Sequence, residues 1–165
     1  MWTSTTGNDP EIIPLMAGAF GASVVIDRPI DDVFAFLLDG ENDPKFSARV
    51  QQMEKATDGP PGVGTIYRST VVDAGMTTQR EFELTEVDAP TKIRWAERSK
   101  NMVTAPEGGY DLKPSGDGTE VRFFNVLEGH GFGKVLHPLA LRSARKGAQD
   151  FANSIKRAVE ASSVT

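Results

Sequence analysis

The sequence contains no cysteine, and this absence excludes disulfide bonds, thiolate metal ligands and a thiol nucleophile together. It contains only two histidines, His130 and His137, and their spacing does not match a paired-ligand motif such as His-Glu-x-x-His. We therefore expect no metal site and no cofactor. The glycine-rich loop at residues 59–64 lacks the Gly-Lys-Ser/Thr ending of a phosphate-binding loop, so we expect a rim loop there.

A long apolar run and a surplus of basic residues are also missing. No signal peptide is visible, the C-terminal helix is too polar to span a membrane, and we expect a cytoplasmic protein. The net charge of −5 argues against nucleic-acid binding. The charge is uneven, because residues 134–161 hold six basic and two acidic residues while the rest of the chain carries −9. We interpret this basic segment as a solvated helix face.

A chain of 165 residues with 39% hydrophobic residues has the size and the core of one domain. We place this domain at residues 18–162, after a polar, turn-rich leader at residues 1–17. Within the leader we expect residues 1–9 to be poorly ordered. The apolar run at residues 12–16 should lie irregularly against the sheet or the long helix, because Pro14 cannot donate to a strand ladder.

The order of the elements predicts an α+β fold. An alternating strand at residues 18–27 precedes a helix that begins after Pro29 and ends at Asp39-Gly40, and a short second helix is expected at residues 44–48. Short turns separate the later strands and favour antiparallel pairing. An amphipathic helix at residues 134–161 closes the chain. The six later strands are expected at residues 50–57, 65–73, 78–87, 92–98, 103–113 and 120–127.

The long helix carries a stripe of residues that change in size along its length. Its second half offers Phe151 and Ile155, whereas its first half offers only Ala140, Ala144 and Gly147. Either the small residues allow the helix to approach the sheet closely, or they leave space for a ligand. The strands favour the second interpretation, because their alternation directs a wall of aromatic residues toward the helix: Tyr67, Phe82, Trp95, Tyr110 and Phe123.

Four segments carry a resemblance to a known superfamily: VFAFLLDG at 33–40, GPPGVGT at 59–65, VDAPTKIRW at 87–95 and GDGTEV at 116–121. With them, residues 18–161 resemble the helix-grip superfamily, which includes the birch-pollen allergen, plant hormone receptors, START lipid-transfer domains and bacterial polyketide cyclase/dehydrase-like proteins. The resemblance implies a seven-stranded curved antiparallel sheet around a long C-terminal helix, with an apolar ligand cavity between them. It does not imply one activity.

Four polar residues are candidates for catalysis. Glu97 lies on the inner face of its strand and could act as a general acid or base. We favour the alternatives of a salt bridge to Arg80 or another inward arginine, or exposure at the cavity mouth. His137 could be a general base, although a capping or rim role is favoured near the start of the helix. Arg80 and Tyr110 are the other two candidates. The expected ligand-binding set is Phe36, Leu37, Tyr67, Ser69, Phe82, Ile93, Trp95, Glu97, Tyr110, Val121, Phe123, Asn125, His137, Ala140, Ala144, Gly147 and Phe151.

Three functions from different classes remain open. The first is binding or carriage of an apolar small molecule, such as a lipid, a polyketide or an isoprenoid-like compound. The second is a cofactor-independent cyclase, aromatase or dehydratase that acts on a polyketide-like substrate in the same cavity. The third is a protein-interaction module, which a filled interior and a large exposed apolar patch would favour. We rank them in this order and leave open whether the protein is an enzyme.

Overall fold

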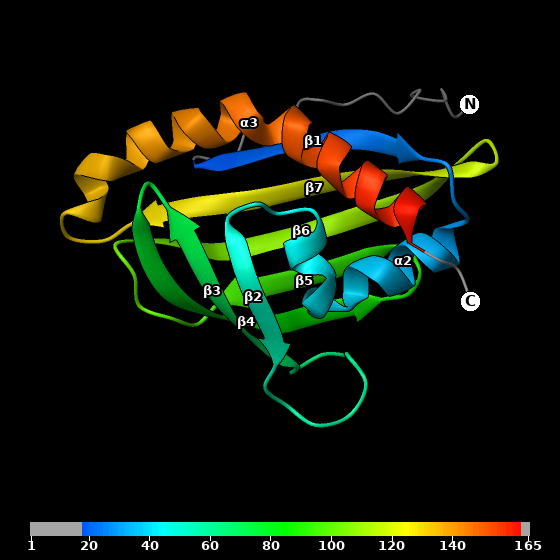
Figure 1. The fold of residues 1–165 in the computed structure, drawn as a ribbon, viewed down its shortest axis with the longest axis horizontal. Coiled ribbons are helices and arrows are strands. Elements are labelled where there is room, and N and C mark those ends of the chain that lie inside the picture. The colour runs from blue at the N-terminus through cyan, green and yellow to red at the C-terminus, as the bar shows by residue number, and fades with distance from the viewer. Residues whose placement is uncertain (1–17, 163–165) are drawn as a thin grey trace, which may run out of the picture.

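Seven antiparallel strands form one sheet in the order β1-β7-β6-β5-β4-β3-β2, as the computed structural model of the protein shows for residues 18–162 (Figure 1). The expected α+β architecture, a curved seven-stranded sheet with a long C-terminal helix, is confirmed. The leader at residues 1–17 lies outside the described residues. The strands are β1 (Ala19–Ile26), β2 (Val50–Lys55), β3 (Ile66–Asp73), β4 (Met76–Asp88), β5 (Lys92–Glu97), β6 (Val103–Ser115) and β7 (Gly118–Gly129).

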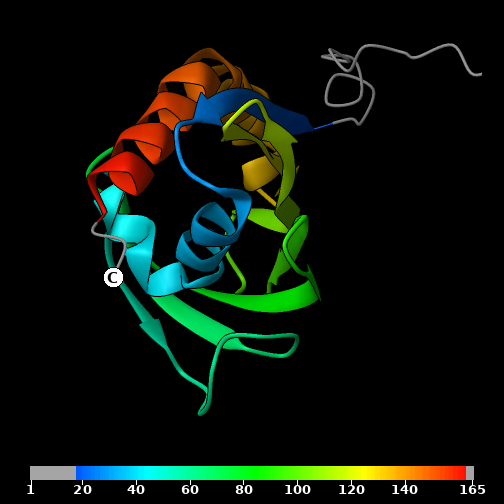
Figure 2. The same ribbon diagram turned by 90° about the vertical axis from the view of Figure 1, so that its right-hand side faces the viewer.

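Two helices, α2 (Ile30–Leu38) and η1 (Gly40–Lys45), connect β1 to β2. The sheet curves around α2, which buries Val33, Phe34, Phe36 and Leu37 against it (Figure 2). The short helix expected at residues 44–48 is wrong in position, because a 3₁₀ turn begins directly after α2. The Asp39 carboxylate accepts a hydrogen bond of 3.1 Å from the Glu41 amide and so starts this turn early.

The long helix α3 (Gly133–Ala161) packs on β1 and β7 and also reaches β6. Its buried residues in the packed half are Ala148, Ala152, Ile155 and Val159. The expectation that Gly147 belongs to the buried stripe is wrong: Gly147 is exposed, and a Cβ atom there would meet nothing within 4 Å. The buried face is therefore rotated slightly from the expected stripe: Ile155 belongs to both, but Ala148 takes the place of Gly147.

Side chains of α3 also donate hydrogen bonds to the edge strand β1. Arg145 Nε donates to the carbonyl of Ala19 at 3.1 Å, and Gln149 Nε2 donates to the carbonyl of Ser23 at 3.2 Å. Lys156 Nζ donates to the Val25 carbonyl at 2.7 Å. These side chains engage carbonyl groups along the edge strand that would otherwise be open to pairing with another strand.

A row of phenylalanine rings crosses the interior from η1 to β1. Phe46 lies 6.3 Å from Phe36 and 5.8 Å from Phe151, measured between ring centroids. Phe123 lies 4.9 Å from Phe151 and 6.2 Å from Phe20. The tilted and edge-on contacts join α2, the end of η1, α3, β7 and β1 into one apolar core.

Candidate functional site

The Glu97 carboxylate lies at the end of β5 and is enclosed by donors. Arg80 Nη1 lies 3.1 Å from both carboxylate oxygens, and Ser99 Oγ, Asn101 Nδ2 and the Ala105 amide donate at 2.7, 3.1 and 2.7 Å. The Glu97 side chain is 0% exposed, against 23% for Arg80. Of the favoured alternatives, the salt bridge with Arg80 is therefore the one that the structure shows. With both oxygens occupied, the carboxylate is not free to accept a proton from a substrate.

The same cluster holds the chain where it leaves β5 and returns as β6. Arg80 Nη1 also donates to the carbonyl of Val103 at 3.2 Å. The pairing of β6 with β7 shifts register between Thr104 and Glu107, and the Ala105 amide in this irregular stretch donates to Glu97. We assign Arg80 and Glu97 to this structural role.

His137 anchors the second turn of α3 to the end of β7. Its Nε2 lies 2.8 Å from the carbonyl oxygen of Leu127, a distance that assigns the ring proton to Nε2. The same nitrogen would lie 3.5 Å from a Cβ atom at Gly18. The hydrogen bond with Leu127 supports the rim role and uses Nε2 as a donor. The other histidine, His130, forms a 2.8 Å hydrogen bond with Thr104 Oγ1.

The polar group that stands out is Asp43, in η1, which the sequence analysis did not single out. Its carboxylate makes no hydrogen bond or ion pair within residues 18–162, and the side chain is only partly exposed. Burial, and then the negative charge of Asp39, raises the pKa of Asp43 from 3.8 to about 7. In the sequence Asp43 is one of three acids within five residues, so no local pattern distinguishes it.

Tyr110 lies on β6, between β7 and β5 in the sheet. The tyrosine is 5% exposed, and its ring meets Trp95 edge-on at 4.9 Å. Burial, and then the charge of Asp43, raises the pKa of the Tyr110 phenol well above its ordinary value. The phenol makes no hydrogen bond to residues 18–162. A carboxyl from η1 and a phenol from β6 therefore lie within electrostatic reach, and neither has a hydrogen-bonding partner among residues 18–162.

A third polar group without a partner is the hydroxyl of Ser69. It lies on the inner face of β3, 2% exposed, opposite Met53 of β2 and Arg80 of β4. Unlike the Tyr110 hydroxyl, its Oγ is fully enclosed, and it is the one such side-chain polar atom in the described part of the chain that lacks a hydrogen bond. Such an atom costs about 1–3 kcal/mol of desolvation, which a water or a ligand atom would recover.

Most residues of the expected ligand-binding set lie on the inner side of the fold. The Trp95 indole donates to Asn125 Oδ1 at 3.2 Å, so the polar groups of these two residues form a hydrogen bond across β6. Phe82, Trp95, Asn125, His137, Ala140, Ala144 and Phe151 are half-buried. The buried members are Phe36, Leu37, Tyr67, Ser69, Ile93, Glu97, Tyr110, Val121 and Phe123.

A separate groove of about 310 Å³ lies over β3 and β4. It is lined by Arg68, Gln79, Arg80, Glu81 and Ser99, and Arg68 and Glu81 form an ion pair of 3.2 Å across it. Three of its lining residues, Arg68, Gln79 and Glu81, alternate with inward-facing residues and therefore lie on the outer face of the sheet. Its charged lining does not suit an apolar ligand.

Neither a metal centre nor a membrane span is found in the part of the chain that the structure describes. Among residues 18–162, histidine, aspartate and glutamate side chains form no group of three that could hold a metal ion. Within the same range no helix combines the length and hydropathy needed to cross a bilayer.

Comparisons with known proteins agree with this architecture. A family model described as "polyketide cyclase / dehydrase and lipid transport" matches residues 18–160. A START superfamily protein from Mycobacterium smegmatis has a similar fold, with a TM-score of 0.71 and 15% identity over 86% of this chain and 97% of that one. A protein from Thermus thermophilus gives a TM-score of 0.70 and 22% identity over 88% and 99%.

The similarity also extends to half of a larger protein. The di-domain ARO/CYC StfQ from the steffimycin biosynthetic pathway gives a TM-score of 0.69 and 12% identity over 87% of this chain and 49% of that one. At these identities the structural matches concern the fold alone. No curated protein sequence matches the chain.

Proposed function

Because the chain belongs to the polyketide cyclase/dehydrase and lipid transport family, we propose that it binds an apolar small molecule of the lipid, polyketide or isoprenoid class between the sheet and α3. The observation that carries this proposal is the pair Asp43 and Tyr110. Tyr110 is buried and Asp43 is partly buried, and neither side chain has a hydrogen-bond or ion-pair partner among residues 18–162. A small number of placed polar groups among apolar side chains is typical of small-molecule sites.

The two groups define what the polar end of the ligand should offer. Near neutral pH, Asp43 can accept a hydrogen bond as a carboxylate or donate one as a carboxyl, because its pKa is about 7. Tyr110 remains protonated and donates. A hydroxyl, carbonyl or amino group on an otherwise apolar molecule fits this pair. The apolar body would lie against Trp95 and the phenylalanine row.

Native mass spectrometry of the freshly purified protein tests the proposal, followed by titration with the fluorescent apolar amine 1-aminoanthracene. We expect a retained apolar compound or saturable probe binding. Asp43→Asn should weaken probe binding several-fold, whereas Asp31→Asn, on the exposed first turn of α2, should not change it. Absence of both a retained compound and probe binding would contradict the proposal.

A second candidate function, a cofactor-independent enzyme of the cyclase or dehydratase type, is supported by the pKa of Asp43. A general base works best when its pKa lies near the working pH, and about 7 meets this condition. Asp43 would take a proton from a carbon next to a carbonyl, and Tyr110 would hydrogen-bond the carbonyl oxygen as negative charge develops. Asp43→Asn should then lower turnover of a polyketide-like substrate by roughly 10²–10⁴ while substrate binding persists.

A further inference from the structure

We propose that the start of α3 is a docking surface for an anionic lipid bilayer. Five exposed apolar residues meet there and are named here the α3-tip patch: Met102, Phe132, Val135, Leu136 and Leu139. Their exposed fractions are 47%, 84%, 76%, 44% and 70%. Single exposed apolar residues are ordinary on protein surfaces, but a cluster of large ones marks a contact surface.

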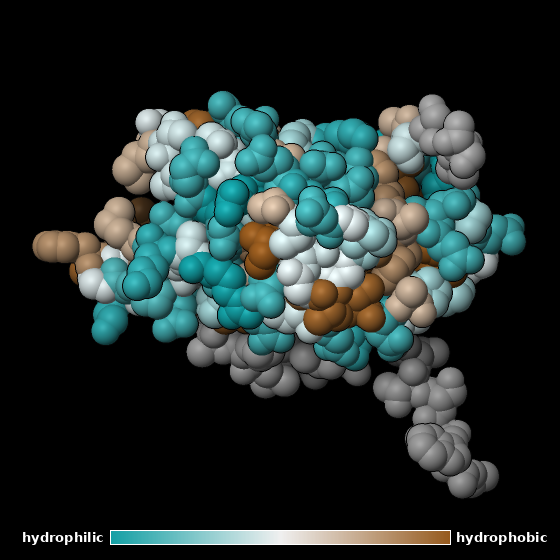
Figure 3. Space-filling view, turned by 90° about the horizontal axis from the view of Figure 1, so that it is seen from below, coloured by the Kyte–Doolittle hydropathy of each residue, from teal (hydrophilic) through white to brown (hydrophobic). Residues whose placement is uncertain are grey.

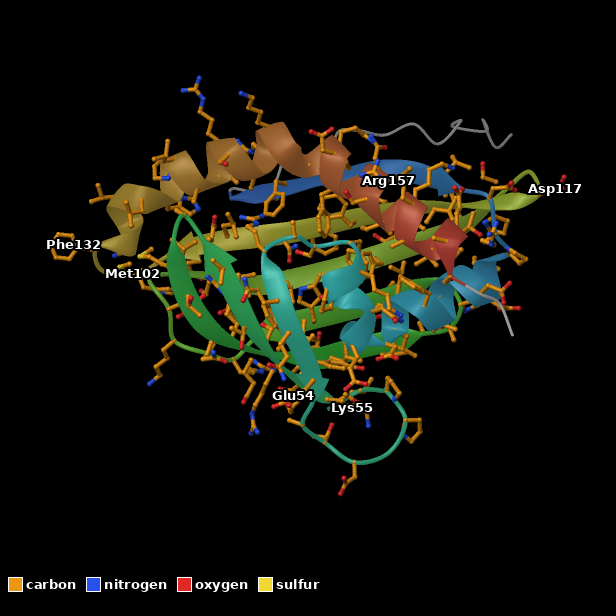
Figure 4. The ribbon with its side chains drawn as sticks, viewed as in Figure 1. Glu54, Lys55, Met102, Asp117, Phe132 and Arg157 are labelled. Carbon is orange, nitrogen blue, oxygen red and sulfur yellow. The ribbon has the colours of Figure 1, made fainter. Side chains whose placement is uncertain are left out.

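The patch is continuous across two segments of the chain. The loop after β5 packs against the start of α3, since the Met102 carbonyl accepts a hydrogen bond of 2.8 Å from the His130 amide. A Cβ atom at Gly133 would collide with the same carbonyl oxygen, so this position admits only glycine at the observed spacing. Met102 and Phe132 both lie at this end of the molecule (Figure 4), and hydrophobic atoms protrude at the same end when it is viewed from below (Figure 3).

Basic residues continue the outer face of the helix behind the patch. Val135, Leu139, Arg142 and Lys146 follow the spacing i, i+4, i+7 and i+11, so they form one stripe that changes from apolar to basic. At 1.5 Å per residue, Arg142 and Lys146 lie about 4 and 10 Å behind Leu139 along the axis. When the apolar tip enters the acyl boundary of a bilayer, these cations reach the depth of the phosphate groups.

The charge of this segment complements an anionic surface. No acidic residue occurs between Glu128 and Asp150, and the interval contains four basic residues. Within residues 18–162, Lys134, Arg142 and Lys146 form no ion pair, while Arg145 donates to the edge strand. Each free cation near an anionic leaflet contributes about 1 kcal/mol of attraction. The negative charge of the rest of the chain would orient the protein with this end toward the membrane.

The shape favours a lipid surface over a protein partner. The start of α3, which carries the patch, lies at one end of the molecule (Figure 1). A stable protein interface requires about 800 Å² of complementary surface on each partner. A fluid bilayer accommodates a convex apolar tip without such complementarity. Docking of this kind is peripheral and does not require a spanning helix. It is also independent of the ligand proposed above, because the patch lies on the outside of the fold.

Vesicle co-sedimentation of the full chain tests the proposal. The probes are vesicles of phosphatidylcholine alone and of phosphatidylcholine with 30% phosphatidylglycerol, each at low and at high salt. We expect binding to the anionic vesicles, loss of binding at high salt, and little binding to the neutral ones. Equal binding to both compositions, or to neither, would overturn the proposal.

Paired variants locate the contact. Phe132→Ser with Leu139→Ser should lower affinity for anionic vesicles at least tenfold, whereas Val63→Ser, an apolar residue 68% exposed on the β2–β3 loop, should not. Arg142→Gln with Lys146→Gln should lower affinity about fivefold for each charge and flatten the salt dependence. Arg157→Gln, on the exposed face of the same helix near its C-terminal end, is the charge control (Figure 4). Equal losses in the controls would overturn the assignment.

Other occupants of the patch would give different results. A dimer that Phe132→Ser with Leu139→Ser dissociates, without vesicle binding by the wild type, would assign the patch to a second copy and overturn the proposal. Vesicle binding that appears only after deletion of residues 1–17 would show that the N-terminal segment covers the patch, and would overturn the proposal for the full chain. Thermal melts verify that each variant remains folded.

Discussion

The carboxyl of Asp43 lies near enough to the phenol of Tyr110 for its charge to add to the effect of burial, and both causes raise the pKa of the phenol. One group comes from a 3₁₀ helix and the other from a central strand, 67 positions apart in the numbering of the chain. Glu97, which has the more obvious sequence signature, is saturated by five hydrogen-bond contacts. The chemistry available to a ligand therefore lies with Asp43 and Tyr110.

The pH dependence of stability should report the environment of Asp43. Because the pKa of this acid rises from 3.8 to about 7 on folding, the folded state binds the proton more tightly than the unfolded state. The contribution is fully present below the ordinary pKa of 3.8 and is lost as pH rises toward 7. We expect a loss below about 4 kcal/mol, since the side chain is partly exposed.

Thermal melts between pH 4 and 8 measure this effect. Asp43→Asn should be more stable than the wild type at pH 8, and Asp31→Asn should follow the wild type throughout. A carbon-detected NMR titration of the Asp43 carboxyl gives its pKa directly. A midpoint near 4 would show that the carboxyl is fully hydrated.

Substitution of Glu97 should damage the fold rather than remove a catalytic group. Glu97→Gln leaves the partly buried charge of Arg80 without its partner, and breaking a buried pair costs about 3–5 kcal/mol. Chemical denaturation measures the loss. Glu54→Gln, on the exposed side of β2, is the matched control and should lie within about 0.5 kcal/mol of the wild type. An unchanged unfolding midpoint for Glu97→Gln would mean that the cluster is dispensable.

The unpartnered hydroxyl of Ser69 should make its removal favourable in the ligand-free protein. Ser69→Ala removes a buried oxygen without a hydrogen bond, so we expect stabilisation of up to about 1–3 kcal/mol. Thr119→Val is the control, because Thr119 Oγ1 is buried and donates to the Arg28 carbonyl at 2.8 Å. That change should destabilise. If both variants lose stability equally, the Ser69 hydroxyl has a bound partner such as water.

The position of the helix stripe predicts opposite effects at neighbouring sites of α3. Gly147→Ala meets open space and should stabilise by about 1 kcal/mol through helix propensity. Ala152→Leu adds volume at a residue 1% exposed and should cost about 1–3 kcal/mol through overpacking. Melting temperatures of the two variants test this rotation. A loss at Gly147 comparable to that at Ala152 would place Gly147 inside the core.

The local sequence determined the elements and the inner face of most strands. Alternation has a period of two, so a single apolar pair such as Ile93 and Trp95 orients the whole strand and identifies Tyr110 and Phe123 by the same argument. The salt bridge of Glu97 with Arg80 was also predictable, because an inward carboxylate requires an inward cation. The resemblance to the helix-grip superfamily supplied the arrangement of the sheet around α3.

Only the tertiary structure decided the rotation of α3, the burial of Asp43 and the exposure of the α3-tip patch. A helix with small residues on several sides has no preferred direction until its neighbours are known, and contacts with β1 made Ala148 rather than Gly147 the buried residue. Asp43 resembles any surface acid until η1 folds beside the sheet. Leu139 looks like a core residue because hydrophobicity records the tendency to avoid water, whereas burial depends on which other segments arrive to cover the side chain.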